Sequence, residues 1–481
     1  MIFLLLVSTI FPLLSGSLLV SVLWPTTARR TASLWFRFWL ALGAGLGIAS
    51  LNLFLCTLLT GSINRWFILG EAGILIVLFA IRHHARTKPN PTYDGPVANQ
   101  GGLASILRAV FFITLLIQGI VFGSLSLRSP HGDWDAWIFW NMRARFMFRA
   151  GTHWKDAFST LIDNPHPDYP LMVSANVMRL WTYVGGETPF CPIMLAFLFT
   201  SATVGLLVSS LSVLRGRTQG LIGGLFLLAT PFFIRHGADQ YADVPLGFFL
   251  LAAVALLSFS DETTDTNKGL LALSGLMAAF AAWTKNEGLL FLVGLLTARW
   301  LVVDFWRTRR VRLRTGLLAF VAGSLPVLLI IFYFKTRLVP QNDLVAAQGA
   351  QTASKLGDLS RYVITAKAFL RQALQINSIP VLVLPFYALF LGTESAQVKR
   401  PAVVASSLVL VLMLAGYFLV FIVAPYDLEL YLRTSLDRLF LQLWPSTIFL
   451  FLMVVVSPRR VAEERLTGRE DFRVQTADTS P

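Results

Sequence analysis

Charged residues are scarce in this chain. Of its 481 residues, 14% are charged and 55% are hydrophobic, whereas roughly 25% of a typical soluble globular protein is charged. This composition excludes a soluble multidomain protein. Forty Lys and Arg stand against 26 Asp and Glu, an excess that would indicate nucleic-acid binding in a soluble protein. In a membrane protein it is expected as the positive flanks of cytoplasmic loops, so we predict no nucleic-acid partner.

The chain has only two cysteines, and several short catalytic motifs are missing. Cys56 and Cys191 both lie in apolar segments, without a CxxC pair or a neighbouring His. We therefore expect packing roles for them, and neither a disulfide nor a cysteine-held metal. The chain also has no phosphate-binding P-loop, no HExxH helix and no GxSxG elbow, so P-loop, zincin, redox and serine-hydrolase chemistry lack their minimum residues. No cofactor is indicated, and a divalent metal stays open.

Long apolar runs recur throughout the chain. About 20 apolar residues cross a bilayer, and the first run lacks the basic start and cleavage site of a signal peptide. We predict an all-α polytopic membrane protein with about 13 transmembrane helices, outer-face loops and interfacial amphipathic helices. Twelve or fourteen spans remain alternatives, because short runs can pair as re-entrant hairpins. The spans are expected at 2–24, 34–58, 66–80, 106–127, 188–214, 221–234, 244–259, 270–284, 288–303, 317–334, 379–391, 402–424 and 441–456.

Basic residues in the short loops predict the orientation. The segment 307–314 carries five arginines, and the positive-inside rule places it in the cytoplasm. Alternation then puts the N-terminus outside and the C-terminus in the cytoplasm, in a bacterial inner membrane. The loop 260–268 is net acidic, which weakens this orientation without reversing it. Three long connections, 128–187, 335–378 and 425–440, are expected on the outer face.

Composition along the chain predicts four regions. N-terminal transmembrane helices with a cytoplasmic loop occupy 1–104, and a central transmembrane core with the large outer loop 128–187 occupies 105–334. C-terminal transmembrane helices with outer loops follow at 335–457. The segment 458–481 is polar and charged without apolar periodicity, which is typical of a disordered cytoplasmic tail.

The large outer loop contains two groups of polar residues. Asp133 and Asp135 follow a span and precede a run of aromatic and basic residues that suits an interfacial helix, with Arg143 facing lipid phosphates. Capping of that helix is an equally good reading of the aspartates. His166 and Asp168 lie farther along between prolines, which hold polar side chains on a stiff turn. Such a turn suits a site or a plain loop.

Two further polar groups interrupt the apolar core. Asp239 and Asp243 are four residues apart, so a helical turn would place them on one face; a solvated cap on the next span is the alternative. At the tight corner WTKNEG, charges are costly unless they are paired or face a cavity. A functional role is favoured there over a pair that reaches the interface. The residues in these two groups are Arg235, Asp239, Tyr241, Asp243, Lys285, Asn286 and Glu287.

The last polar group is DLELYLRTSLDRLF, which contains Arg433 and Arg438. Its charges form i, i+4 pairs, as in a salt-bridged surface helix. Arg438 stands at the edge of an apolar segment, where a guanidinium can hold a phosphate by two parallel hydrogen bonds. Isolated charges within spans, such as Glu71, lie within reach of the interface and receive no catalytic role.

Together these groups resemble the GT-C superfamily of polytopic glycosyltransferases, in the bacterial branch similar to protein O-mannosyltransferases and aminoarabinose lipid A transferases. The resemblance covers about 103–334 and rests on the order of the acidic pair, the His-Pro turn, YADVP and TKNEG. It implies transfer of a sugar from a polyprenyl-phosphate donor to a lipid, glycan or protein acceptor on the outer face of the membrane, among membrane lipids. Single displacement would invert the anomeric centre.

The resemblance also implies roles for residues. Asp133 or Asp135 would be the general base, with His166 and Asp168 in the catalytic group. The expected donor-binding residues are Arg235, Asp239, Tyr241, Asp243, Lys285, Asn286, Glu287, Arg433 and Arg438, and Lys285 is favoured over Arg438 for the donor phosphate. A secondary transporter and a non-catalytic subunit of envelope assembly are the alternatives. A transporter predicts charges at mid-span, whereas this chain concentrates them in the outer loops.

Overall fold

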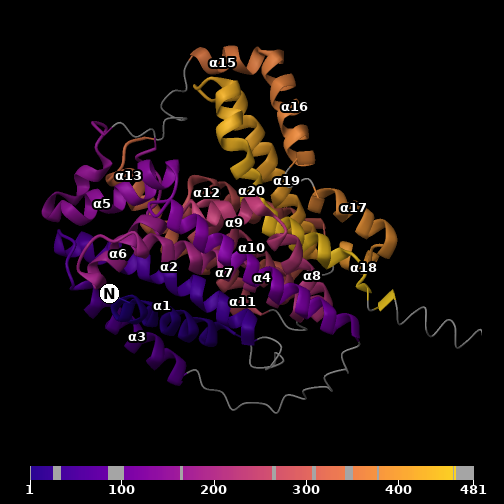
Figure 1. Ribbon diagram of the computed structural model, residues 1–481, viewed down its shortest axis with the longest axis horizontal. Coiled ribbons are helices and arrows are strands. Elements are labelled where there is room, and N and C mark those ends of the chain that lie inside the picture. The colour runs from indigo at the N-terminus through magenta and orange to yellow at the C-terminus, as the bar shows by residue number, and fades with distance from the viewer. Residues whose placement is uncertain are drawn as a thin grey trace, which may run out of the picture.

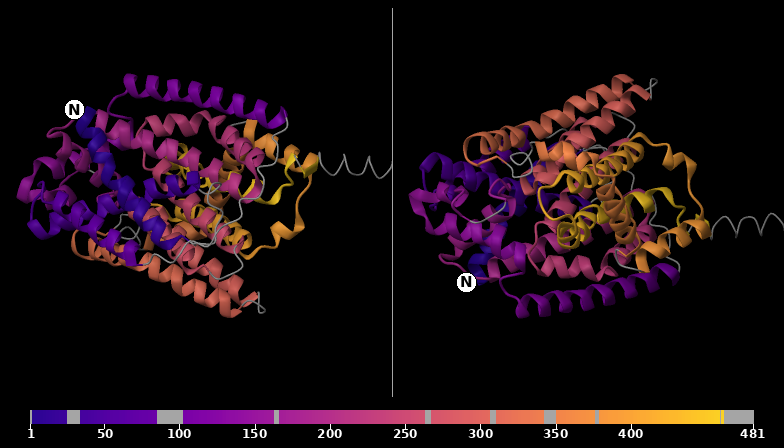
Figure 2. Two further views of the ribbon diagram at one scale, coloured as in Figure 1. Left: turned by 90° about the horizontal axis from the view of Figure 1, so that it is seen from below. Right: turned by 90° about the horizontal axis from the view of Figure 1, so that it is seen from above.

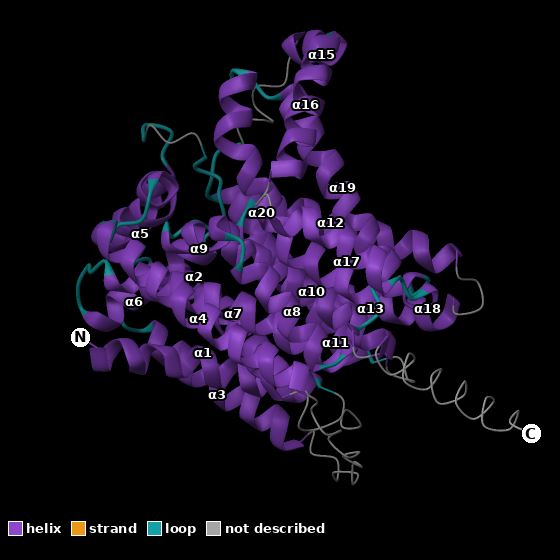
Figure 3. Cartoon of the chain, turned by 45° about the vertical axis from the view of Figure 1, so that its right-hand side comes forward, coloured by secondary structure: helices purple, strands orange, loops and turns teal. Residues whose placement is uncertain are grey.

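The computed structural model describes residues 2–24, 34–84, 102–162, 166–262, 267–305, 310–341, 350–375, 379–458 and 460–461. Across these ranges the regular secondary structure is helical, apart from one isolated bridge between Thr393 and Val455, and loops join the helices (Figure 3). The loop before 102 and the predicted tail at 458–481 fall almost entirely outside the described residues.

Helices account for most of the described residues. In the first half they are α1 (Ile2–Leu23), α2 (Leu34–Thr60), α3 (Phe67–His84), α4 (Gly102–Arg128), the π-helical turn η1 (Ala136–Trp140), α5 (Asn141–Arg149), η2 (Gly151–Phe158), α6 (Met172–Val184), α7 (Phe190–Arg215), α8 (Arg217–Leu228) and α9 (Pro231–Ala238). In the second half they are α10 (Asp243–Glu262), α11 (Lys268–Thr284), α12 (Asn286–Phe305), α13 (Arg310–Arg337), α15 (Ala350–Gly357), α16 (Leu359–Gln375), α17 (Ile379–Leu391), α18 (Ser395–Val398), α19 (Pro401–Val423) and α20 (Leu428–Val454).

Nine of the described helices are long and apolar enough to cross a membrane, and a bent pair adds a tenth. The chain is therefore an integral membrane protein with nine or ten candidate spans, fewer than the thirteen predicted. Each predicted run is helical, but α11 has 17 residues and α17 has 13, short of the roughly 20 that a span needs. The run 221–234 forms α8 and α9, which meet at 66°.

The prediction of a separate outer segment at 425–440 was wrong. Helix α20 runs unbroken through this segment from Leu428. The Asp427 side chain caps its first turn by accepting a hydrogen bond from the Leu430 N–H at 2.8 Å. The remaining turns of α20 pack on the bundle through a buried apolar face. Consequently Arg438 lies within a long candidate span rather than in a loop before one.

Helix α10 lies at the centre of the bundle and is almost wholly buried along its length. It packs against α7, α11 and α20, while α4 and α13 lie on opposite flanks of the molecule with much of their apolar surface exposed (Figures 1 and 2). Small residues allow the close approach of neighbouring helices. A Cβ on Gly45 of α2 would lie 1.7 Å from the Pro12 carbonyl oxygen of α1, so only glycine fits this crossing.

Candidate active site

The loop that follows α4 docks on the turn that precedes α10. Gly132 has a φ of 78°, and a Cβ there would lie 2.6 Å from the Asp239 carbonyl oxygen, so glycine is required. The Asp133 N–H donates to that same carbonyl at 3.2 Å. Gln240 keeps a φ of 62°, unusual for a residue with a side chain, and its amide oxygen accepts from Asn141 at 2.7 Å. These contacts bring two acidic segments together.

Asp135 forms an ion pair with Arg438 of α20. The carboxylate is 5% exposed, and the guanidinium also lies over the Tyr241 ring at 5.4 Å. Burial raises the pKa of Asp135, and the Arg438 charge opposes this rise. A buried carboxylate with a raised pKa, held in one orientation, is suited to accept a proton from a substrate hydroxyl.

Lys285 lies between two carboxylates at the junction of α11 and α12. Its ammonium is 2.9 Å from Asp243 and 3.0 Å from Glu287, and the residue is only 3% exposed. Gln442 of α20 donates to Asp243 at 2.6 Å and in turn accepts from the Tyr417 hydroxyl at 2.8 Å. A buried charge needs such partners to offset its desolvation.

A second lysine holds the Pro-rich turn of the large loop. Lys335, near the end of α13, donates to the Asp168 carboxylate at 2.7 Å and to the Asn286 side-chain oxygen at 2.6 Å. Asn286 also donates to Asp168 at 2.9 Å. Asp168 is buried, whereas the Lys335 side chain is 25% exposed. The large loop is thereby tied to α12 and α13.

Aromatic stacking fixes the remainder of this turn. The rings of His166 and Tyr169 stack at 4.6 Å, and Tyr169 stacks on Trp140 at 5.2 Å. Burial lowers the pKa of His166 to about 4, so the imidazole is neutral at pH 7. Arg143 is 1% exposed and donates to the Tyr169 carbonyl at 2.7 Å and the His166 carbonyl at 2.8 Å. The expectation that Arg143 faces lipid phosphates was wrong, because the turn needs its donors.

The structure brings most of the candidate residues together. Those gathered by direct contacts are Asp135, His166, Asp168, Tyr241, Asp243, Lys285, Asn286, Glu287 and Arg438. Their positions are the first loop after α4, the start of α10, the α11–α12 junction and the first half of α20. Contacts between these side chains join segments that lie far apart in the sequence.

Four candidates lie at the margin or apart. Arg433 is exposed on α20 and pairs weakly with Glu429 at 3.8 Å. The Arg235 side chain is 66% exposed and lies 3.7 Å from Asp239. Burial and the neighbouring Asp133 raise the pKa of Asp239 to about 6, so these two half-buried carboxyls form a coupled pair beside the main cluster.

Sequence reasoning missed three members of the cluster, Lys335, Gln442 and Tyr417. Gln442 is the one with a readable signal, because it stands four residues after Arg438 and therefore on the same helical face. Within the described ranges, no group of three or more His, Cys, Asp or Glu side chains is arranged to hold a metal ion.

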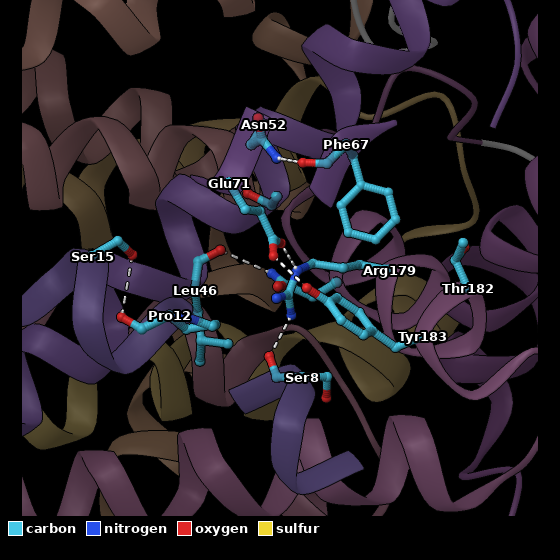
Figure 4. A network of polar contacts seen from close by, with 12 residues as sticks. Ser8, Pro12, Ser15, Leu46, Asn52, Phe67, Glu71, Arg179, Thr182 and Tyr183 are labelled. Carbon is cyan, nitrogen blue, oxygen red and sulfur yellow. Dashed lines mark hydrogen bonds and ion pairs between the residues drawn. The ribbon is translucent and has the colours of Figure 1, made fainter. Parts of the chain in front are cut away.

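A separate polar network surrounds Glu71 of α3 (Figure 4). Arg179 of α6 donates to Glu71 at 2.5 Å and to the Ser8 carbonyl of α1 at 2.9 Å, and the Tyr183 hydroxyl also donates to Glu71. Glu71 is 3% exposed. The prediction that Glu71 reaches the interface was therefore wrong, since a buried partner neutralises it and fastens α6 to α1 and α3.

Comparison with known proteins bears on the same region. Residues 166–334, about a third of the chain, match the family model of dolichyl-phosphate-mannose-protein mannosyltransferases. The chain is a membrane glycosyltransferase that is similar to this family over the matched segment. It uses a lipid-phosphate sugar donor, as the GT-C resemblance implied. The matched segment contains His166, Asp168, Asp243, Lys285 and Glu287, but neither Asp135 nor Arg438. No curated protein and no solved structure matches the chain significantly.

Proposed function

We propose that this glycosyltransferase passes a sugar from a polyprenyl-phosphate donor to an acceptor hydroxyl on the outer face of a bacterial inner membrane. The observation that carries this proposal is the contact of Asp135 with Arg438, 303 residues apart in the chain. In this proposal the contact places Asp135, as the proton acceptor, next to Arg438, as the cation that binds the donor phosphate, beside the apolar helix bundle. A lipid-phosphate sugar needs these two groups together with an apolar environment for its tail.

Asp135 is the general base in this proposal. It takes the proton of the acceptor hydroxyl, the acceptor oxygen attacks the anomeric carbon, and the bond from that carbon to the donor phosphate oxygen breaks. The phosphate leaves with the bonding electron pair, and the single displacement inverts the anomeric centre. Asp133, half-buried and next to Asp239, is the alternative base, because it lies on the same loop and lacks an ion-pair partner among the described residues.

Arg438 is favoured over Lys285 as the ligand of the donor phosphate. The Arg438 side chain is 17% exposed, whereas that of Lys285 is 4% exposed and is enclosed by Asp243 and Glu287. Lys285 then orients the two carboxylates, and the partly exposed Lys335 is a second cation within reach of the cluster. Charge stabilisation matters more than an acid here, because the leaving group is already a phosphate.

A transfer assay tests the reaction and its side of the membrane. Purified protein is incubated with a polyprenyl-phosphate sugar and an acceptor mixture, and NMR determines the anomeric configuration of the product; retention would refute single displacement. A cysteine replacing Ser159, introduced into cells, should react with an impermeant thiol reagent added outside, and a cysteine replacing Ser457 should not. The reverse labelling pattern would place the cluster on the cytoplasmic face.

A further inference from the structure

Helices α15 and α16 form a unit that projects beside the ends of α19 and α20 (Figures 1 and 3). Basic side chains fasten this unit to the last turn of α19. Arg361 donates to the carbonyls of Ile422 at 2.8 Å and Phe421 at 2.9 Å, and Lys355 donates to the Ala424 carbonyl at 3.0 Å. Cations at a helix C-terminus satisfy its free carbonyls and its dipole, so the unit has a fixed inner side.

Aromatic packing defines the same inner side of α16. The Phe369 ring lies 5.4 Å from that of Phe418 and 6.0 Å from that of Phe421, both on α19. It also lies 5.5 Å from the Phe440 ring on α20. Because these contacts hold Phe369 against the bundle, the opposite side of α16 must face outward.

That outward side carries an apolar stripe. Leu359 is 78% exposed, Val363 52%, Leu370 63% and Leu374 55%. At about 100° per residue, these four positions fall within one narrow strip of the helix surface. No described segment covers them, so the stripe needs an apolar environment from outside the chain.

Two cations flank the stripe on one side. Lys367 and Arg371 are exposed, stand one helical turn apart and have no ion-pair partner among the described residues. Helix α16 contains no Asp or Glu at all. A stripe of apolar side chains edged only by cations matches the chemistry of anionic lipid headgroups above acyl chains.

We infer that α16 binds anionic membrane lipid, with the stripe among the acyl chains and with Lys367 and Arg371 on the lipid phosphates. A second copy of the chain fits less well, since its own α16 would bring further cations to the same place. The apolar helix α17 begins at Ile379, four residues after α16 ends, which keeps this part of the chain next to the bilayer. The inference does not depend on the transfer reaction.

Lipid preference in nanodiscs tests the inference. The full chain is reconstituted with phosphatidylglycerol and phosphatidylcholine in graded ratios, and native mass spectrometry measures the association constant of one lipid relative to the other. Wild type should prefer phosphatidylglycerol. In Lys367→Gln/Arg371→Gln this preference should fall by about fivefold for each cation removed. The matched control is Lys155→Gln/Arg337→Gln, which removes two exposed cations elsewhere and should keep the wild-type preference.

Two results would overturn the inference. One is an equal lipid preference in wild type and in Lys367→Gln/Arg371→Gln. The other is a wild-type dimer in the discs that becomes monomeric in Leu370→Gln/Leu374→Gln, because the stripe would then be an interface between copies. These positions are exposed, so the variants should fold, and an unchanged melting temperature verifies this. Under the inference, Leu370→Gln/Leu374→Gln stays monomeric and retains less of both lipids.

Discussion

Replacing Lys285 with Met tests the ion-pair network at the centre of the cluster. Lys285 is 3% exposed and lies within about 3 Å of both Asp243 and Glu287. Its loss would leave the fully buried Asp243 carboxylate without this cation and still accepting from the Gln442 amide. Breaking a buried ion pair by removing one partner typically costs about 3–5 kcal/mol. We therefore expect Lys285→Met to lower the free energy of unfolding by this amount in the absence of donor.

A double-mutant cycle isolates the interaction. Asp243→Asn should also destabilise the protein, and Lys285→Met/Asp243→Asn should recover part of the summed loss, with a coupling of about 0.5–3 kcal/mol. Lys155→Met is the matched control, because Lys155 is exposed; its effect should stay within about 0.5 kcal/mol. Unfolding is followed by tryptophan fluorescence in mixed micelles titrated with denaturing detergent.

Unchanged stability of Lys285→Met would instead favour a role of Lys285 in binding the donor. If Lys285→Met unfolds like wild type in the absence of donor, the ion pairs of Lys285 do not contribute to the stability of the fold. A polyprenyl-phosphate sugar should raise the melting temperature of wild type. Loss of that shift in Lys285→Met, with normal stability otherwise, would refute the assignment of the donor phosphate to Arg438.

Three further predictions concern other parts of the molecule. The pKa of Asp239 is raised from 3.8 to about 6 in the folded protein, so the stability that its proton contributes is present below about pH 4 and is lost as the pH rises through 6; in thermal melts across this range, Asp239→Asn should lack that loss. Gly132→Ala should lower turnover on the order of 10²-fold by displacing the loop that follows α4, measured at saturating donor. Glu71→Gln should destabilise the protein by about 3–5 kcal/mol, and unfolding of Glu71→Gln/Arg179→Met should show partial recovery.

The sequence predicts the helices better than it predicts the spans. Each of the thirteen apolar runs coincides with a helix or with the bent pair α8–α9, because apolar length is visible in the chain. Whether a short helix such as α11 crosses the membrane depends on its neighbours and cannot be read from its own residues. The first half of α20 was misplaced for a related reason, since its charged residues resemble a surface helix although its apolar face continues into the candidate span.

The residues of the candidate site could also be predicted only in part from the sequence. Asp135, Asp243 and Lys285 interrupt apolar segments and could be found from that pattern alone. The contact of Lys335 with Asp168 spans 167 residues, and no local spacing encodes it. The pairing of Glu71 with Arg179 was missed likewise, because only tertiary packing brings α3 against α6.

The most direct test of the proposed mechanism is the turnover of Asp135→Asn with a polyprenyl-phosphate sugar. Asparagine keeps the size of the side chain but cannot accept the hydroxyl proton. Transfer should fall by roughly 10²–10⁴-fold, while the donor still raises the melting temperature as it does in wild type. Full transfer activity in Asp135→Asn would contradict the assignment of Asp135 as the base and move that role to Asp133.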